Sequence, residues 1–255
     1  NMTIRYVKKA TLITLLGLLP SFAIAESFVA GLNAIDRNHY ATAFRSFRPL
    51  AESGIAEAQN NLGFLYQNGL GVRRNYSLAL SWYTKSAEQN LPEAHHNLGM
   101  LNYLGHGVAQ DFRIARRHFV KASDGELGAA SYMIGLIYFK GEGFQKNDVQ
   151  ARRYFAKAAR EGDPNGQYMY AYLLLTGHGK SETESSIWEN LFAREAALED
   201  VRASRIWAEI AALNGQQDAK GIAEFARIQS EFEETEIESA ISDCMSSNYK
   251  NCPFL

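Results

Sequence analysis

Six histidines and two cysteines are the residues best suited to chemistry in this chain of 255 residues. The histidines are His39, His95, His96, His106, His118 and His178. None stands in a metal-ligand spacing with cysteine or carboxylate. His106 and His178 occupy equivalent Gly-His-Gly turns but lie 72 residues apart, so a polar turn residue is the simpler interpretation. There is also no nucleophile-elbow or phosphate-loop sequence. We therefore predict no catalytic residue, no metal and no cofactor.

The cysteines, Cys244 and Cys252, are eight positions apart near the C-terminus. A thiol pair in an exported protein usually forms a disulfide. Closing so short a loop stabilises a protein by about 2 to 3 kcal/mol in the chain-entropy model. The alternative, a redox or metal pair, requires a Cys-x-x-Cys spacing that is absent. We expect a structural disulfide that pins the C-terminal tail.

The first 25 residues have the three parts of a signal peptide. Basic residues come first, the apolar stretch Ala10–Leu19 follows, and the small-residue triplet Ala23-Ile24-Ala25 precedes Glu26. This apolar core is too short for a membrane-spanning helix, which needs roughly 20 residues. We predict cleavage after Ala25 and a protein that resides in the periplasm or is secreted, with no membrane span after cleavage.

Composition is that of a globular protein, with 46% apolar and 21% charged residues. The formal net charge is -2, and cleavage would remove three basic residues and no acidic ones. The chain therefore has no basic excess with which to bind nucleic acid.

A 36-residue period organises the chain after this segment. Ala58-Gln59-Asn60-Asn61-Leu62-Gly63 recurs as Ala94 to Gly99, as Ala130 to Gly135 and, in altered form, as Gly166 to Ala171. Each unit has helical apolar spacing on both sides of a Gly-x-Gly turn. The glycines of the pattern are Gly63, Gly69, Gly71, Gly99, Gly105, Gly107, Gly135, Gly141, Gly143, Gly177 and Gly179.

Gly63, Gly99 and Gly135 are expected inside helices, where glycine costs up to about 1 kcal/mol relative to alanine. A close approach of the second helix would offset this cost. We predict that the period-matched residues Trp82, His118 and Tyr154 pack over the bare backbone.

The pattern resembles the Sel-1-like repeat family, a relative of tetratricopeptide repeats. The matching features are Ala-x-x-Asn-Leu-Gly, the Gly-x-Gly-Val turn and the second-helix residues Ala79, Trp82, Tyr83 and Ala87. The resemblance implies an all-α fold, a right-handed α/α superhelix (solenoid) of helix pairs, and a function in protein interaction. Some relatives with a cysteine pair in every repeat were described as β-lactamase-like, but this chain lacks those cysteines.

We divide the chain into five segments. After the signal peptide (1–25) we expect a leading helix pair (26–54), three full repeats (55–162), a degenerate fourth repeat with an insertion near Thr183 to Glu199 (163–215) and C-terminal capping helices with the disulfide (216–255). Polar-faced caps keep such arrays soluble.

The strongest functional signal is an apolar stripe along the first helix of each repeat. Because Ala58, Leu62 and Leu65 should face the second helix, positions 60, 64 and 67 and their equivalents are predicted on the opposite, concave side. The residues predicted to bind a partner there are Phe64, His96, Met100, Tyr103, Tyr132, Leu136, Phe139, Tyr168 and Tyr172. In the alternative interpretation, adjacent first helices bury this stripe as core.

From these features we predict a non-catalytic, monomeric scaffold or adaptor that binds a protein or peptide partner in this groove. The alternative is an envelope hydrolase or a peptidoglycan- or β-lactam-binding protein. That class would need a serine, histidine or carboxylate constellation in the groove, and the stripe positions contain no carboxylate.

Overall fold

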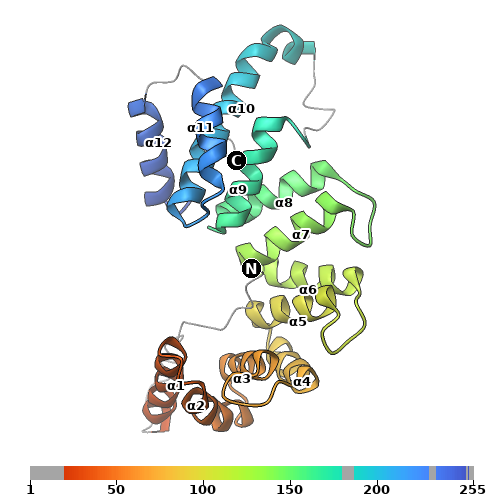
Figure 1. The fold of residues 1–255 in the computed structure, drawn as a ribbon, viewed down its shortest axis with the longest axis vertical. Coiled ribbons are helices and arrows are strands. Elements are labelled where there is room, and N and C mark those ends of the chain that lie inside the picture. Colours follow the sequence, from red (N-terminus) through yellow and green to blue (C-terminus); the bar gives the residue numbers. More distant parts are fainter. Residues whose placement is uncertain (1–19, 180–186, 230–233, 251, 253–255) are drawn as a thin grey trace. The chain divides into compact units, whose positions relative to one another are not determined.

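The computed structural model describes residues 20–179, 187–229, 234–250 and 252. Every regular element in these ranges is an α-helix, and consecutive helices form antiparallel pairs (Figure 1). The prediction of an all-α repeat fold is therefore confirmed. The chain forms two compact parts, residues 1–125 and 126–255, which we describe separately. Residues 1–19 of the predicted signal peptide lie outside the described ranges.

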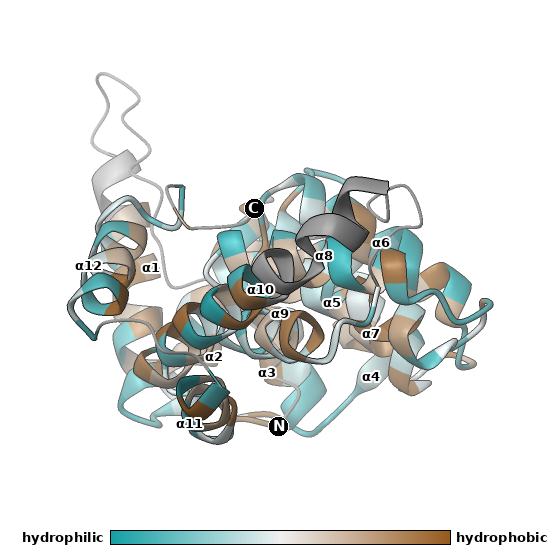
Figure 2. Ribbon diagram, turned by 90° about the horizontal axis from the view of Figure 1, so that it is seen from above, coloured by the Kyte–Doolittle hydropathy of each residue, from teal (hydrophilic) through white to brown (hydrophobic). Residues whose placement is uncertain are grey.

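The N-terminal part contains three helix pairs that pack in chain order. Its helices are α1 (Pro20–Asp36), α2 (Tyr40–Glu52), α3 (Ala56–Asn68), α4 (Tyr76–Ala87), α5 (Pro92–Leu104) and α6 (Phe112–Asp124). The C-terminal part contains α7 (Gly128–Lys140), α8 (Asp148–Arg160), α9 (Pro164–Thr176), α10 (Ile187–Leu213), α11 (Ala219–Gln229) and α12 (Glu234–Ser246). Hydrophilic (teal) and hydrophobic (brown) residues alternate along the helices (Figure 2). The second helix α6 buries one face, whereas the first helices α5 and α7 are buried on most sides.

The second helix of each full repeat begins at a side-chain cap that recurs every 36 residues. The carboxamide of Asn75 accepts a hydrogen bond from the backbone N–H of Leu78 at 3.0 Å. Asp111 and Asn147 cap α6 and α8 in the same way. Such a cap stabilises a helix by about 1 kcal/mol, because it satisfies a backbone donor that has no partner within the helix.

The Gly-x-Gly turn ends each first helix and also joins neighbouring repeats. Gly69 ends α3 with a φ of 68°, in the left-handed region, as predicted for the first glycine of the turn. The second glycine of the turn, at Gly71, Gly107 and Gly179, lies against the start of the preceding second helix. A Cβ atom on Gly107 would lie 2.6 Å from the Cβ of Tyr76, so only glycine fits there.

The glycine inside each first helix faces an aromatic ring, but not the predicted one. A Cβ atom on Gly99 would lie 2.6 Å from the ring of Phe119, and Gly135 has the same relation to Phe155. In the first repeat the ring belongs to Tyr83. The predicted partners Trp82, His118 and Tyr154 were therefore wrong by one position. One residue turns a helix by about 100°, which moves these side chains away from the glycine.

The residues displaced from the glycine contact make other contacts. Lys85 places its ammonium group 4.3 Å from the ring centre of Trp82. Tyr154 stacks on Tyr138 with ring centres 5.9 Å apart. The same glycine contact also occurs in the leading pair, where Gly31 faces Phe47. The leading pair is thus built on the same principle as the repeats, although its turn lacks the Gly-x-Gly.

A hydrogen bond that recurs between helices establishes the register of the last repeat. It joins Gln89 to Gln59 at 2.9 Å and Ser131 to Glu161 at 2.5 Å, each across 30 residues. The equivalent bond, from Asn214 to Gln167 at 2.8 Å, spans 47 residues. The fourth repeat therefore contains 17 additional residues, and α10 is 27 residues long, compared with 13 for the equivalent helix α8. From Ile187 onward the predicted insertion is part of this continuous helix, and residues 183–186 lie outside the described ranges.

An ion pair joins the C-terminal helix α12 to α10, and a disulfide joins α12 to the C-terminal tail. The buried guanidinium of Arg205 donates two hydrogen bonds to Glu234 on α12, at 2.6 and 2.7 Å. Cys244 and Cys252 form the predicted disulfide. Between them, the hydroxyl of Tyr249 accepts a hydrogen bond from Asn214 at 2.9 Å. The tail therefore contacts the turn that follows α10.

Substitution of a repeat glycine tests the central contact. We expect Gly135→Ala to lower the free energy of unfolding by about 1 to 3 kcal/mol, because the ring of Phe155 must move. Gly221 on α11 is the matched control, since no atom lies within 4 Å of its Cβ position. There, alanine should raise stability by up to about 1 kcal/mol through helix propensity. Urea unfolding of both variants measures the difference. Equal effects at the two positions would contradict the close-contact model.

Candidate interaction surface

The structure buries much of the predicted stripe in the N-terminal part. His96, Met100 and Tyr103 are 2%, 1% and 5% exposed, whereas Phe64 is half-buried. The residues at the same stripe positions in the first repeat, Asn60 and Gln67, are also buried. Buried side chains cannot serve as exposed anchors, so of the four predicted residues in this part only Phe64 has enough accessible surface to contact a partner.

Several stripe residues contact the second helix of their own repeat instead of facing away from it. The ring centre of His96 lies 5.5 Å from that of Phe119, and that of Tyr103 lies 5.3 Å from that of Phe112. Positions 60 and 67 are only about 40° to 60° around the helix from the repeat glycine that meets the second helix. The predicted placement of these positions on the opposite side was therefore wrong.

In the C-terminal part the stripe is more exposed. Leu136 is buried, but Tyr132, Phe139, Tyr168 and Tyr172 are half-buried. They lie on the first helices α7 and α9 of the third and fourth repeats. Each therefore presents part of an aromatic side chain to solvent.

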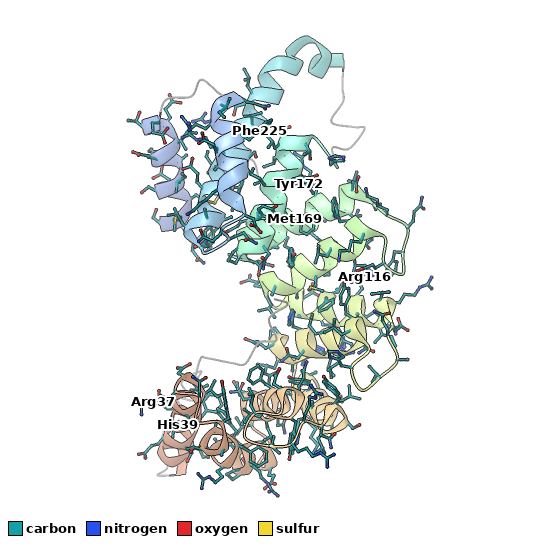
Figure 3. The ribbon with its side chains drawn as sticks, in the orientation of Figure 1. Arg37, His39, Arg116, Met169, Tyr172 and Phe225 are labelled. Carbon is teal, nitrogen blue, oxygen red and sulfur yellow. A yellow bond between two sulfur atoms is a disulfide. The ribbon has the colours of Figure 1, made fainter. Side chains whose placement is uncertain are left out.

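Neighbouring contacts hold two of these rings in place. Tyr132 and Phe139 contact Phe155, with ring centres 5.8 and 6.3 Å away. The ammonium of Lys146 lies 5.3 Å from the ring centre of Phe139. Figure 3 shows Tyr172 and Met169 on α9, the helix that packs against α11. The described surface thus has partly accessible aromatic side chains on α7 and α9, and contacts with neighbouring side chains hold the two rings on α7 in place.

The stripe continues onto α11, which the sequence analysis missed. Asn214 is equivalent to Glu161, so residues after the insertion are shifted by 53 positions. With this shift, Tyr168, Tyr172 and Leu175 correspond to Gly221, Phe225 and Ile228. Phe225 is 51% exposed and Ile228 is 72% exposed. The 36-residue period fails at the insertion, and counting again from Gly215 would have revealed the equivalence.

A histidine pair lies between α5 and α6. The Nδ1 atoms of His95 and His118 are 3.3 Å apart. Burial, reinforced by His95, Lys121 and Arg117, lowers the pKa of His118 to about 4. Burial followed by Lys121 lowers the pKa of His95. A hydrogen bond between two imidazoles requires one donor and one acceptor. The two rings can therefore form this bond only while at least one of them is neutral.

Other features of the described residues add no reactive centre. Over these residues, no group of three or more His, Cys, Asp or Glu side chains converges as a metal site would need. No described helix is long and apolar enough to cross a membrane. A shallow depression of about 560 Å³ lies between α10 and α11. Its lining residues are Glu209, Ala212, Leu213, Lys220, Ala223, Glu224 and Arg227.

Comparison with known protein families identifies the repeats. The model of the Sel1 repeat matches residues 56–91, 92–126, 128–163 and 164–183. These boundaries coincide with the helix pairs, and the last match ends at residue 183, before α10 begins. The chain belongs to the Sel1 repeat family. Proteins of this family generally mediate protein–protein interactions and are typically non-catalytic scaffolds.

Two solved structures are similar to the chain. A protective antigen of uropathogenic Escherichia coli strains, with an SLR fold, is 22% identical with a TM-score of 0.67. The similarity covers 88% of this chain but 48% of the antigen, so the chain spans about half of its length. A Sel1 repeat protein from Oxalobacter formigenes is 27% identical with a TM-score of 0.58, covering 81% of this chain and 88% of that protein. A search of curated proteins gives no match.

The histidine pair predicts an acid-sensitive N-terminal part. The ordinary pKa of histidine is 6.5, and the pKa of His118 in the folded protein is about 4. As the pH falls between these two values, the unfolded chain binds a proton at His118 that the folded chain does not bind. Stability therefore falls as the pH drops through this window. We expect the wild-type protein to lose about 1 to 2 kcal/mol more than His118→Phe between about pH 7 and pH 4.

Chemical denaturation at a series of pH values measures this difference. His39→Phe is the control, because the His39 side chain is exposed and lies away from the pair. It should keep the wild-type pH profile. A His118→Phe profile that coincides with that of the wild type would show that the pair does not couple folding to protonation.

Proposed function

We propose that the protein is a non-catalytic scaffold or adaptor that binds a protein or peptide partner through half-buried aromatic residues of its first helices. In the C-terminal part these are Tyr132, Phe139, Tyr168 and Tyr172, and in the N-terminal part Phe64. The observation that carries the proposal is the run of partly exposed tyrosines on α7 and α9. Membership of the Sel1 repeat family supports it.

The chemistry of these residues suits partner binding. Tyrosine offers a large apolar ring and a hydroxyl while ordering few rotatable bonds, and it is enriched among residues that dominate binding energy. Tyr168 and Tyr172 are four residues apart on α9, so they lie on one face of the helix. Phe155 on α8 already contacts the rings of Tyr132 and Phe139, which lowers the entropy that these two rings lose on binding.

We further propose that the protein acts in the periplasm or is secreted. The Cys244–Cys252 disulfide supports this location, because disulfides form and persist in oxidising compartments. The packing of α1 is compatible with cleavage after Ala25. Among the α1 residues whose burial is described (24–36), the buried apolar residues Phe28, Ala34 and Ile35 follow that position, while Ile24 and Ala25 are exposed.

A site-specific crosslink tests the binding surface. A photoreactive phenylalanine analogue in place of Tyr172 should form an adduct with a partner in the native cell envelope, identified by mass spectrometry. Tyr172→Ser should abolish capture of that partner while leaving the helical content unchanged, because part of the ring is exposed.

Tyr154 provides the matched control for this experiment. It is also a half-buried tyrosine of the C-terminal part, but it lies on the second helix α8 and stacks on Tyr138. The analogue at position 154 should give no adduct with the same partner. Equal crosslinking at both positions, or capture that survives Tyr172→Ser together with Tyr168→Ser, would refute the proposed surface.

Export makes a separate prediction. Protein recovered from the envelope fraction should begin at Glu26, as determined by N-terminal sequencing. Ala25→Arg should block processing, because signal peptidase requires a small residue before the cleaved bond. Recovery of an intact N-terminus from the wild-type protein would contradict export by this route.

A further inference from the structure

Helix α11 carries the most exposed apolar stripe of the described residues. Gly221, Phe225 and Ile228 lie on one line along the helix, since their spacings of four and seven residues bring them to the same face. In the repeats, this line borders the first helix of the next repeat. For example, Asn60 on α3 accepts a hydrogen bond from Asn97 on α5 at 2.9 Å. Among the residues that the structure describes, no further first helix follows α11, and α12 packs on α10.

At the other end of the array, the exposed residues of α1 are mixed in character. Glu26, Asn33 and Asp36 are polar, whereas Ile24, Val29 and Ala30 are apolar. Head-to-tail stacking of two copies would therefore place Phe225 and Ile228 partly against carboxylates. Burying those carboxylates against apolar side chains is costly, so contact between two α11 faces is more favourable.

We propose that the α11 face binds the same face of a second copy of this chain, with the two helices antiparallel. A two-fold arrangement about the midpoint of residues 224 and 225 places Gly221 of one copy opposite Ile228 of the other. Gly221 has no atom within 4 Å of its Cβ position, so it leaves a notch that can receive the Ile228 side chain. Phe225 then packs against its own counterpart.

Charges beside the stripe favour the same arrangement. Glu224 and Arg227 lie on one flank of α11, where they form an exposed ion pair at 2.7 Å. In an antiparallel pair related by a two-fold axis, the same flank of each helix lies on the same side of the interface, and the two chains run in opposite directions. Arg227 of each copy then lies beside Glu224 of the other, so the intramolecular ion pairs can be exchanged for intermolecular ones. The stripe and its flank are therefore self-complementary.

Sedimentation velocity of the purified full-length chain tests this proposal. The wild-type protein should shift from monomer to dimer between about 1 µM and about 200 µM, the range of a weak interface between single helices. Phe225→Glu and Ile228→Lys should each weaken the dimer at least tenfold. Both side chains are mostly exposed in the monomer, so the variants should fold normally.

Two further variants make the test specific to this face and this register. Leu78→Glu is the matched control, because Leu78 is an exposed apolar residue, 41% accessible, on α4. It should dimerise like the wild type. Gly221→Leu fills the notch and should abolish the dimer, although leucine raises the melting temperature of the monomer through its better helix propensity.

A wild-type protein that remains monomeric over the whole range would overturn the proposal. Dimerisation that survives Phe225→Glu and Gly221→Leu would overturn it as well, because the contact would then lie elsewhere. The result is independent of the proposed partner surface. Variants at Tyr168 and Tyr172 test that surface, and they should leave the dimer intact.

Discussion

The contact between a bare glycine on one helix and an aromatic ring on the next is the constraint on which the rest of the structure depends. Gly31, Gly63, Gly99 and Gly135 each face such a ring. The missing side chain lets the two helices approach closely, and dispersion contacts with the ring offset the helix propensity that glycine loses. Since the contact recurs in the leading pair and in each of the three full repeats, it sets a common geometry for these helix pairs.

Departures from this geometry occur where the repeat series changes. In the fourth repeat Ala171 replaces the glycine, and in α11 the equivalent residue is Glu224. A glutamate at this position leaves no room for a closely packed second helix. In agreement with this, α12 packs on α10, to which Arg205 and Glu234 attach it. The end of the array is therefore stabilised by an ion pair and a disulfide rather than by another glycine contact.

The same stripe position has different environments along the C-terminal part. Leu136 is 7% exposed, Tyr172 is half-buried and Phe225 is 51% exposed. A position that is core in one repeat is thus surface in the last helix, because burial depends on whether another helix packs beyond it. This gradient explains how one repeated pattern can supply both the internal packing of a scaffold and its binding surfaces.

The sequence by itself determined the helix pairs, the turn glycines and the disulfide partners, because these depend on local backbone preferences and on a period of 36 residues. Only the tertiary structure decided that Phe119, and not His118, covers Gly99, since one position rotates a side chain by about 100°. It also paired His95 with His118 and buried Met100. Contacts between helices decide these side-chain partners and their burial. A periodic sequence pattern predicts the packed face of a helix, but with an uncertainty of about one residue.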